Sequence, residues 1–133
     1  MKIVLDTHYL LWCLFDTNKL TEKEKSIILD FDNEIYVSTV SLWEISIKYS
    51  LKKLHMAEFK INEIIESIDE SGYEIINLES DEAISYHLLP KIEHKDPFDR
   101  MIIWQAIKRN MFLLTKDKSI PEYEKYGLKL LRK

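Results

Sequence analysis

The sequence predicts an α/β fold, in which helices cover both faces of a parallel sheet of four to five strands. Short apolar runs rich in β-branched residues alternate with longer segments of helical spacing, and strands separated by helices pair in parallel with right-handed crossovers. The chain has 133 residues and no repeat, low-complexity tract or Pro- or Ser-rich linker. Because domains most often have roughly 100–150 residues, we expect a single domain over residues 1–133.

Each element has a local signal, beginning with the first half of the chain. Apolar, β-branched and aromatic runs predict strands, and apolar positions three or four residues apart predict helices. A capping-box pattern, Ser or Thr followed three residues later by Glu, marks a helix start. It occurs at Thr21–Glu24 and at Ser41–Glu44. The predicted order is strand Lys2–Leu5, helix Thr7–Phe15, helix Thr21–Phe31, strand Ile35–Ser38 and helix Ser41–Lys53.

The second half continues the alternation. Gly72 favours a helix end because glycine adopts the left-handed conformation at little cost. Asp96 followed by Pro97 is typical of a helix start, and Asn110 is expected to end that helix. The predicted order is helix Ile61–Ile68, strand Tyr73–Leu78, a short helix that starts at Ser80 and ends before Pro90, helix Pro97–Arg109, strand Met111–Thr115 and a last short strand at Leu128–Leu131.

Four acidic residues lie where a predicted strand ends or a predicted helix begins: Asp6, Glu44, Asp99 and Asp117. Because the carboxyl ends of parallel strands meet at one edge of a sheet, we expect these side chains to share one crevice. Four ionised carboxylates repel one another unless a cation holds them, and oxygen ligands favour a hard divalent ion such as Mg²⁺. Such a site suits phosphodiester cleavage, whereas two carboxylates alone would suggest glycoside hydrolysis.

Each acid also has a purely structural interpretation. Asp6 could simply cap a helix, Glu44 could be the last residue of a capping box, and Asp117 could belong to a turn. Asp96 is interpreted as an N-cap because proline follows it. Asp99, in the first turn of the same helix, is either a metal ligand or a residue favoured there by the helix dipole.

Composition excludes several other classes. A net charge of −4 argues against a broad basic face that wraps nucleic acid. With only two glycines, Gly72 and Gly127, the chain has no glycine-rich phosphate loop. The single cysteine, Cys13, excludes an internal disulfide and a cysteine zinc cluster. No apolar run approaches the roughly 20 residues that span a bilayer, so we expect no membrane association and a cytoplasmic location.

Basic and aromatic residues near the acids have two interpretations each. The cationic residues close to the acids in sequence, which either guide phosphates or are ordinary solvated charges, are Lys48, Lys95, Arg100, Lys116 and Lys118. Three tryptophans on otherwise apolar helical faces are expected in the core or at an interface rather than stacked on bases: Trp12, Trp43 and Trp104. The four histidines show no zinc-ligand spacing.

Four segments, in this order and spacing, resemble the PIN-domain ribonucleases, and most closely the VapC-type toxins of bacterial and archaeal toxin–antitoxin pairs. The segments are Val4–Trp12 (Val-Leu-Asp-Thr-His-Tyr-Leu-Leu-Trp), Ser41–Lys48 (Ser-Leu-Trp-Glu-Ile-Ser-Ile-Lys), Asp96–Ile102 (Asp-Pro-Phe-Asp-Arg-Met-Ile) and Leu114–Asp117 (Leu-Thr-Lys-Asp). The resemblance covers essentially the full chain.

This resemblance implies a three-layer α/β/α fold and Mg²⁺- or Mn²⁺-dependent cleavage of RNA. Asp6, Glu44 and Asp99 would be the core metal ligands, and Asp117 the fourth acidic residue. Thr115 matches a hydroxyl position that hydrogen-bonds an acidic neighbour. The resemblance further implies a homodimer and inhibition by a cognate antitoxin whose tail occupies the groove.

We therefore predict catalysis by the four acids and RNA contacts from Thr115, Lys48, Arg100 and Lys116. The helix around Trp43, Ile45, Ile47 and Tyr49 has more large apolar residues than one buried face requires. Such a surplus often marks an interface, and a two-fold dimer is the commonest closed oligomer.

Other classes agree less well with the residues. An aspartyl-nucleophile phosphatase needs a second acid two residues after the first, where His8 stands. A receiver domain needs a phosphoacceptor Asp after a middle strand, but Ser38 and Glu79 follow the second and third predicted strands. A non-catalytic PIN-like domain that binds RNA or a partner, or another Mg²⁺-dependent phosphohydrolase, remains as the alternative.

Overall fold

A computed structural model describes residues 1–54, 59–91, 96–117 and 120–131. Its sheet has five parallel strands in the order β3-β2-β1-β4-β5. The strands are β1 (Lys2–Leu5), β2 (Glu34–Ser38), β3 (Glu74–Ile76), β4 (Phe112–Leu114) and β5 (Lys129–Leu130). The α-helices are α1 (Thr7–Phe15), α2 (Glu22–Leu29), α3 (Thr39–Ser50), α4 (Ile64–Glu70), α5 (Ser80–Ser85) and α6 (Pro97–Arg109). The 3₁₀ helices are η1 (Thr17–Lys19), η2 (Ile61–Glu63), η3 (Tyr86–Leu88) and η4 (Ile120–Tyr126).

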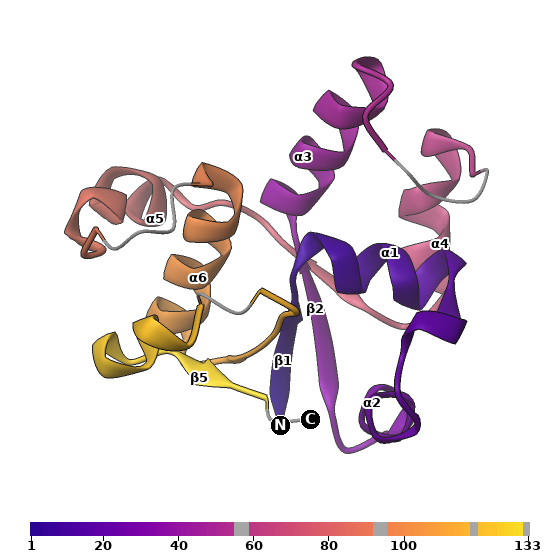
Figure 1. Ribbon diagram of the computed structural model, residues 1–133, viewed down its shortest axis with the longest axis horizontal. Coiled ribbons are helices and arrows are strands. Elements are labelled where there is room, and N and C mark those ends of the chain that lie inside the picture. The colour runs from indigo at the N-terminus through magenta and orange to yellow at the C-terminus, as the bar shows by residue number, and fades with distance from the viewer. Residues whose placement is uncertain (55–58, 92–95, 118–119, 132–133) are drawn as a thin grey trace.

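Helices cover both faces of this sheet, with α5 and α6 on one side and α1, α2 and α4 on the other (Figure 1). Successive strand residues point to opposite faces, so Val4 packs with α6 whereas Ile3 and Leu5 pack with α1 and α4. A parallel sheet buried on both faces needs apolar residues at consecutive positions, as β1 provides. The prediction of a three-layer α/β/α fold with a parallel sheet is confirmed. Across the described residues, no helix has the length and apolar character needed to cross a bilayer.

Two predicted helix starts are confirmed by their hydrogen bonds. Thr21 and Glu24 form the reciprocal capping box of α2. Asp96 caps α6 by accepting from the Phe98 N–H at 2.9 Å, and Pro97 occupies the first turn. At the other end of α6, Asn110 takes the predicted left-handed conformation, with φ 57°.

The predicted capping box at Ser41–Glu44 is wrong. Helix α3 begins at Thr39, two residues before the predicted start at Ser41. Its N-cap is Ser38, which accepts from the Val40 N–H at 3.0 Å. Ser41 and Glu44 are consequently buried inside the helix. The helix also ends at Ser50 rather than Lys53.

Smaller differences concern the length or the presence of elements. Strand β3 covers only Glu74–Ile76 of the predicted Tyr73–Leu78, because its register with β2 ends where Ser38 faces Ile76. Helix α2 ends at Leu29 instead of Phe31. The 3₁₀ helix η4 was not predicted; its buried Ile120 and Tyr123 complete the core beside α6.

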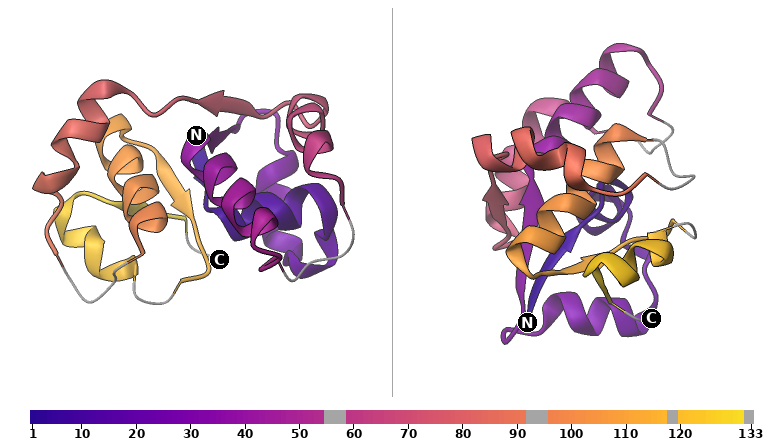
Figure 2. Two further views of the ribbon diagram at one scale, coloured as in Figure 1. Left: turned by 90° about the horizontal axis from the view of Figure 1, so that it is seen from above. Right: turned by 90° about the vertical axis from the view of Figure 1, so that its left-hand side faces the viewer.

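The strand order creates a switch point between β1 and β4. The chain proceeds outward from β1 through β2 to β3, and then returns to the other side of β1 as β4 and β5. Ligand sites in open α/β sheets lie outside the carboxyl ends of strands at such a point. The Asp6 N–H, just after β1, donates to the Leu114 carbonyl of β4 at 3.1 Å. The starts of α3 and α6 lie at the same edge of the sheet, onto which the left view of Figure 2 looks.

Candidate active site

Asp6 links the ends of β1 and β4. Its Oδ1 accepts from the Tyr9 N–H at 2.8 Å, which caps α1, and its Oδ2 accepts from the Lys116 N–H at 3.4 Å. Burial raises the pKa of this carboxyl, while its hydrogen bonds, including one from Thr115, and the charge of His8 oppose the rise. Capping and membership of the site are therefore compatible roles for Asp6.

Glu44 is held from two sides on the buried face of α3. Thr7 Oγ1 donates to its Oε1 at 2.6 Å, and Lys48, one turn further along α3, pairs with its Oε2 at 2.5 Å. The Ser41 Oγ lies 3.0 Å from the Thr7 Oγ1. Thr7 and Ser41 were not predicted as site residues. Their signal in the sequence was position alone, because Thr7 follows Asp6 directly and Ser41 lies one turn before Glu44 on the same helix face.

Burial opposes ionisation of Lys48, yet the hydrogen bond and charge of Glu44, with the charges of Asp96 and Asp99, raise the pKa of its ammonium above the ordinary value. The cation is thus stabilised beside the acids. We infer that Lys48 compensates part of their charge.

The pKa of Asp99 is the clearest indication that the acids lie near one another. It lies in the first turn of α6 and is half-buried. Burial raises its pKa to about 7, together with the negative charges of Asp96, Glu44, Asp6 and Asp117. These five side chains come from the ends of β1 and β4, from α3 and from the start of α6, so the four predicted acids lie near one another at one edge of the sheet.

Asp117 lies in the loop after β4, half-buried. Its N–H donates to the Thr115 Oγ1 at 3.1 Å, and the Thr115 side chain also hydrogen-bonds Asp6. Thr115 therefore connects the loop that carries Asp117 to the carboxylate at the end of β1.

The donor set suits a hard divalent cation. All four predicted acids offer carboxylate oxygens, the ligands that Mg²⁺ prefers, and their mutual repulsion at Asp99 is what a cation would relieve. As the side chains stand, no three acidic, histidine or cysteine groups within the described ranges lie close enough to hold one ion. The carboxylates of Asp6 and Glu44 each accept a hydrogen bond from a protein donor, Tyr9 N–H and Thr7 Oγ1 respectively.

A basic cleft of about 340 Å³ adjoins the acids. Two of its lysines, Lys48 and Lys116, were predicted as substrate contacts. Its lining residues, from four separate segments, are Thr7, His8, Leu11, Trp12, Lys19, Lys48, Lys53, Leu54 and Lys116. Trp12 was expected in the core or at an interface; its half-buried ring packs against the core and also forms part of the cleft wall.

The structure does not place Arg100 at the site, so its predicted contact with RNA is corrected. Its guanidinium is buried on a different face of α6, where it donates to the hydroxyls of Tyr86 and Tyr123 and to the carbonyls of Leu89 and Pro90. Consecutive residues of a helix point in directions about 100° apart, which separates Arg100 from Asp99. Lys95 and Lys118 lie outside the described residues.

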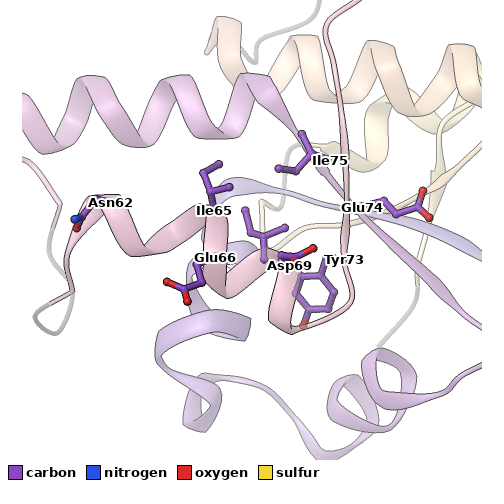
Figure 3. Close-up of a pocket in the computed structure, with 8 residues that line it drawn as sticks. Asn62, Ile65, Glu66, Asp69, Tyr73, Glu74 and Ile75 are labelled. Carbon is purple, nitrogen blue, oxygen red and sulfur yellow. The ribbon is translucent and has the colours of Figure 1, made fainter.

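A larger cavity, of about 640 Å³, lies away from these acids between α4 and β3. Figure 3 shows the side chains of Glu66, Asp69 and Glu74 around it, and its described lining includes no lysine or arginine. Three carboxylates without a cation would repel phosphate groups. We therefore do not assign RNA to this cavity.

The chain is similar along nearly its whole length to solved structures of low sequence identity. VapBC2 from Rickettsia felis, bound to a DNA fragment from its promoter, is 20% identical, with a TM-score of 0.67 and 98% of both chains covered. VapBC-5 from Mycobacterium tuberculosis, a member of the VapBC family of toxin–antitoxin systems, is 15% identical, with a TM-score of 0.61 and 99% and 98% covered. FitAcB from Neisseria gonorrhoeae is 17% identical, with a TM-score of 0.64 and 98% and 96% covered.

These likenesses show a shared fold. No curated protein sequence matches the chain. The PIN domain family, however, matches residues 3–126, a range that contains Asp6, Glu44, Asp99 and Asp117. The chain therefore belongs to the PIN domain family.

Proposed function

We propose that this protein is a divalent-metal-dependent endoribonuclease, and that it is the toxin of a toxin–antitoxin pair. The observation that carries the proposal is the effect of four other carboxylates on Asp99, whose pKa they help to raise to about 7, beside a cleft lined by four lysines. Clustered carboxylates repel one another, so such a cluster destabilises the fold when no cation is bound to it. A strongly shifted pKa of a side chain in a cleft is typical of functional sites.

Asp6, Glu44 and Asp99, with Asp117 beside them, would hold the ion. A bound Mg²⁺ or Mn²⁺ supplies charge that stabilises the phosphoryl oxygens and orients the scissile phosphate. The protein's own groups prepare this arrangement: Thr7 and Lys48 fix the orientation of the Glu44 carboxylate, and Thr115 connects Asp6 to the Asp117 loop. The lysines of the cleft attract the RNA backbone despite the net charge of −4.

The direct test is cleavage of a labelled RNA by purified protein. We expect cleavage with Mg²⁺ or Mn²⁺ and none in EDTA, because the ion would supply the positive charge that stabilises the phosphoryl oxygens during cleavage. Re-addition of the metal should restore the activity. Binding of RNA without cleavage under any of these metal conditions would instead support a non-catalytic member of the family.

The toxin assignment is supported by the family and by the similarity to VapBC and FitAcB structures. An antitoxin tail with cationic side chains would suit the acidic cluster by charge. Induced expression of the protein is expected to arrest growth, whereas Asp99→Asn is expected not to. Co-expression of a small protein encoded next to this one should relieve the arrest; unimpaired growth with a demonstrably active nuclease would argue against the toxin role.

We also propose a homodimer. Of the predicted interface residues, Ile45 is buried in the core, but Trp43 is 61% exposed and Tyr49 is 45% exposed. Trp43 borders an apolar groove of about 200 Å³ between α3 and α6, next to Phe98 and Met101. Exposed apolar surface of this kind often marks an interface.

Light scattering should therefore give about twice the chain mass of 15.9 kDa at micromolar concentration, in accord with the commonest closed symmetry. Trp43→Arg is expected to yield monomers. Ile84→Arg, which changes an exposed apolar residue on α5, serves as the control and should leave the mass unchanged. A monomeric parent protein would refute this proposal.

A further inference from the structure

Trp12 presents an aromatic ring to the basic cleft. Its ring and the ring of Tyr9 are in T-shaped contact, with centroids 5.1 Å apart, and its centroid lies 6.1 Å from that of the His8 ring. Tyr9 is fully buried and hydrogen-bonds Glu24, so the ring of Trp12 rests on a fixed support. The Lys116 Nζ lies 5.3 Å from the Trp12 centroid, and both residues line the cleft. The Lys116 ammonium thus lies over the Trp12 ring, which is supported by the buried Tyr9.

Three further lysines line the same cleft as this ring. Lys19 ends η1, Lys48 lies on α3 and Lys53 follows α3. Lys48 is engaged with Glu44, which places the cleft directly against the acidic cluster. A cleft that combines cationic groups with an accessible aromatic ring is what proteins use to bind single-stranded nucleic acids: lysines pair with phosphates and the ring stacks on a base.

The size and position of the cleft also agree with a single nucleotide. Its volume of about 340 Å³ is at the lower end of the roughly 300–1,000 Å³ range of small-ligand sites. The Lys116 N–H contacts Asp6 and the Lys48 Nζ contacts Glu44, so a phosphate next to these lysines would be next to the acids. A base within a duplex is already stacked and paired, and cannot reach a side chain in this way.

We propose that the cleft is a subsite for one unpaired nucleotide, whose base stacks on Trp12 in place of Lys116 and whose phosphates pair with Lys19, Lys53 and Lys116. The displaced Lys116 ammonium would exchange the aromatic face for a phosphate. The subsite makes the protein select single-stranded RNA. It rests on the proposed function only in taking RNA as the ligand, since binding requires neither metal nor cleavage.

Fluorescence of Trp12 tests the stacking directly. In a Trp43→Phe, Trp104→Phe background Trp12 is the single tryptophan, because the chain has three. Titration in EDTA with single-stranded hexauridylate should quench its emission to saturation. An RNA duplex of equal length should leave the emission nearly unchanged at the same concentrations.

Affinity measurements with labelled hexauridylate, by anisotropy in EDTA, separate the contributions. Trp12→Ala should weaken binding by about 5- to 150-fold, the range for loss of one base–aromatic stack, and Trp12→Phe should lie between it and the parent. Lys19→Ala and Lys53→Ala should each lower the slope of log affinity against log salt by about 0.7. Lys125→Ala is the matched control, because Lys125 also lies over an aromatic ring, that of Tyr126, but outside the cleft; it should change neither quantity.

Several results would overturn the subsite. They are unchanged Trp12 emission while anisotropy shows binding, equal quenching by duplex and single strand, parent-like affinity of both Trp12 variants, or no binding of hexauridylate at all. The outcome is independent of catalysis. A protein that quenches as expected but never cleaves with Mg²⁺ would retain the subsite and lose the proposed nuclease function. A protein that cleaves RNA with Mg²⁺ but whose affinity for RNA does not depend on Trp12 would retain the nuclease function and lose the subsite.

Discussion

Asp99→Asn is expected to reduce RNA cleavage in saturating Mg²⁺ by at least about 100-fold while the protein stays folded. Groups that merely support metal ligands change activity or affinity by about 10- to 100-fold when they are mutated, and a ligand itself should matter at least as much. Asparagine keeps the volume of the side chain but removes its charge. Asp6→Asn and Glu44→Gln should have comparable effects, measured as initial rates on one labelled RNA with circular dichroism as the check of folding.

Asp96→Ala is the control for this result. Asp96 accepts from the Phe98 and Asp99 N–H groups at 2.9 and 3.4 Å, as an N-cap does, so its loss should lower the free energy of unfolding by about 0.5–2 kcal/mol and leave most of the cleavage. Parent-like rates in folded Asp99→Asn would remove this residue from the ligand set. Loss of cleavage in Asp96→Ala at an unchanged melting temperature would show that the roles of the two neighbours are reversed.

The same Asp99→Asn variant should melt at a higher temperature than the parent in EDTA at about pH 8. The folded state raises the pKa of Asp99 from 3.8 to about 7, so it binds the proton more tightly than the unfolded chain does. Ionisation of Asp99 consequently destabilises the fold, fully above the folded pKa and not at all below the unfolded one. A pKa change of this size corresponds to about 4 kcal/mol, and we expect asparagine, itself partly buried, to recover about 1–4 kcal/mol of it.

The difference between variant and parent should therefore shrink as the pH falls from about 8 to about 4. Saturating Mg²⁺ should reverse the order of melting temperatures, because a ligand that binds the folded state stabilises the parent, with its complete ligand set, more than the variant. Asp32→Asn, which changes an exposed acid outside the cluster, should show neither effect. Melting of Asp99→Asn below the parent both in EDTA and in Mg²⁺ would contradict the metal site at this residue.

Elements with strong local signals could be predicted from the sequence. The strand Lys2–Leu5 and the helix Thr7–Phe15 have the predicted bounds, because an apolar run and helical spacing meet at Asp6, which caps the helix. The cap residues Asp96 and Asn110 were likewise identified, since their side chains act within one turn of their own position. The convergence of the four acids followed from the topology of parallel strands.

The remaining features depend on tertiary contacts. Ser41 and Glu44 have the spacing of a capping box, but this pattern does not distinguish a helix start from a buried helix face. In the fold, the Glu44 carboxylate accepts a hydrogen bond from Thr7 of α1. Adjacency in sequence suggested a common role for Asp99 and Arg100, whereas the rotation of the helix separates them. Lys19 and Lys53 are not next to any of the four site acids in sequence, and the packing of η1 and the end of α3 brings them to the cleft.

The pairing of β1 with β4 has a consequence for biosynthesis. Asp6 and the loop that holds Thr115 and Asp117 are about as far apart in the chain as the fold allows, and they meet only when Leu114 accepts the Asp6 N–H. Contacts of such long sequence separation form late, after the cost of closing the loop has been met. Nascent or truncated chains that lack β4 would hold Asp6 and Glu44 without their partners. The order of strands in the sheet therefore delays assembly of the site until β4 has been synthesised and has paired with β1.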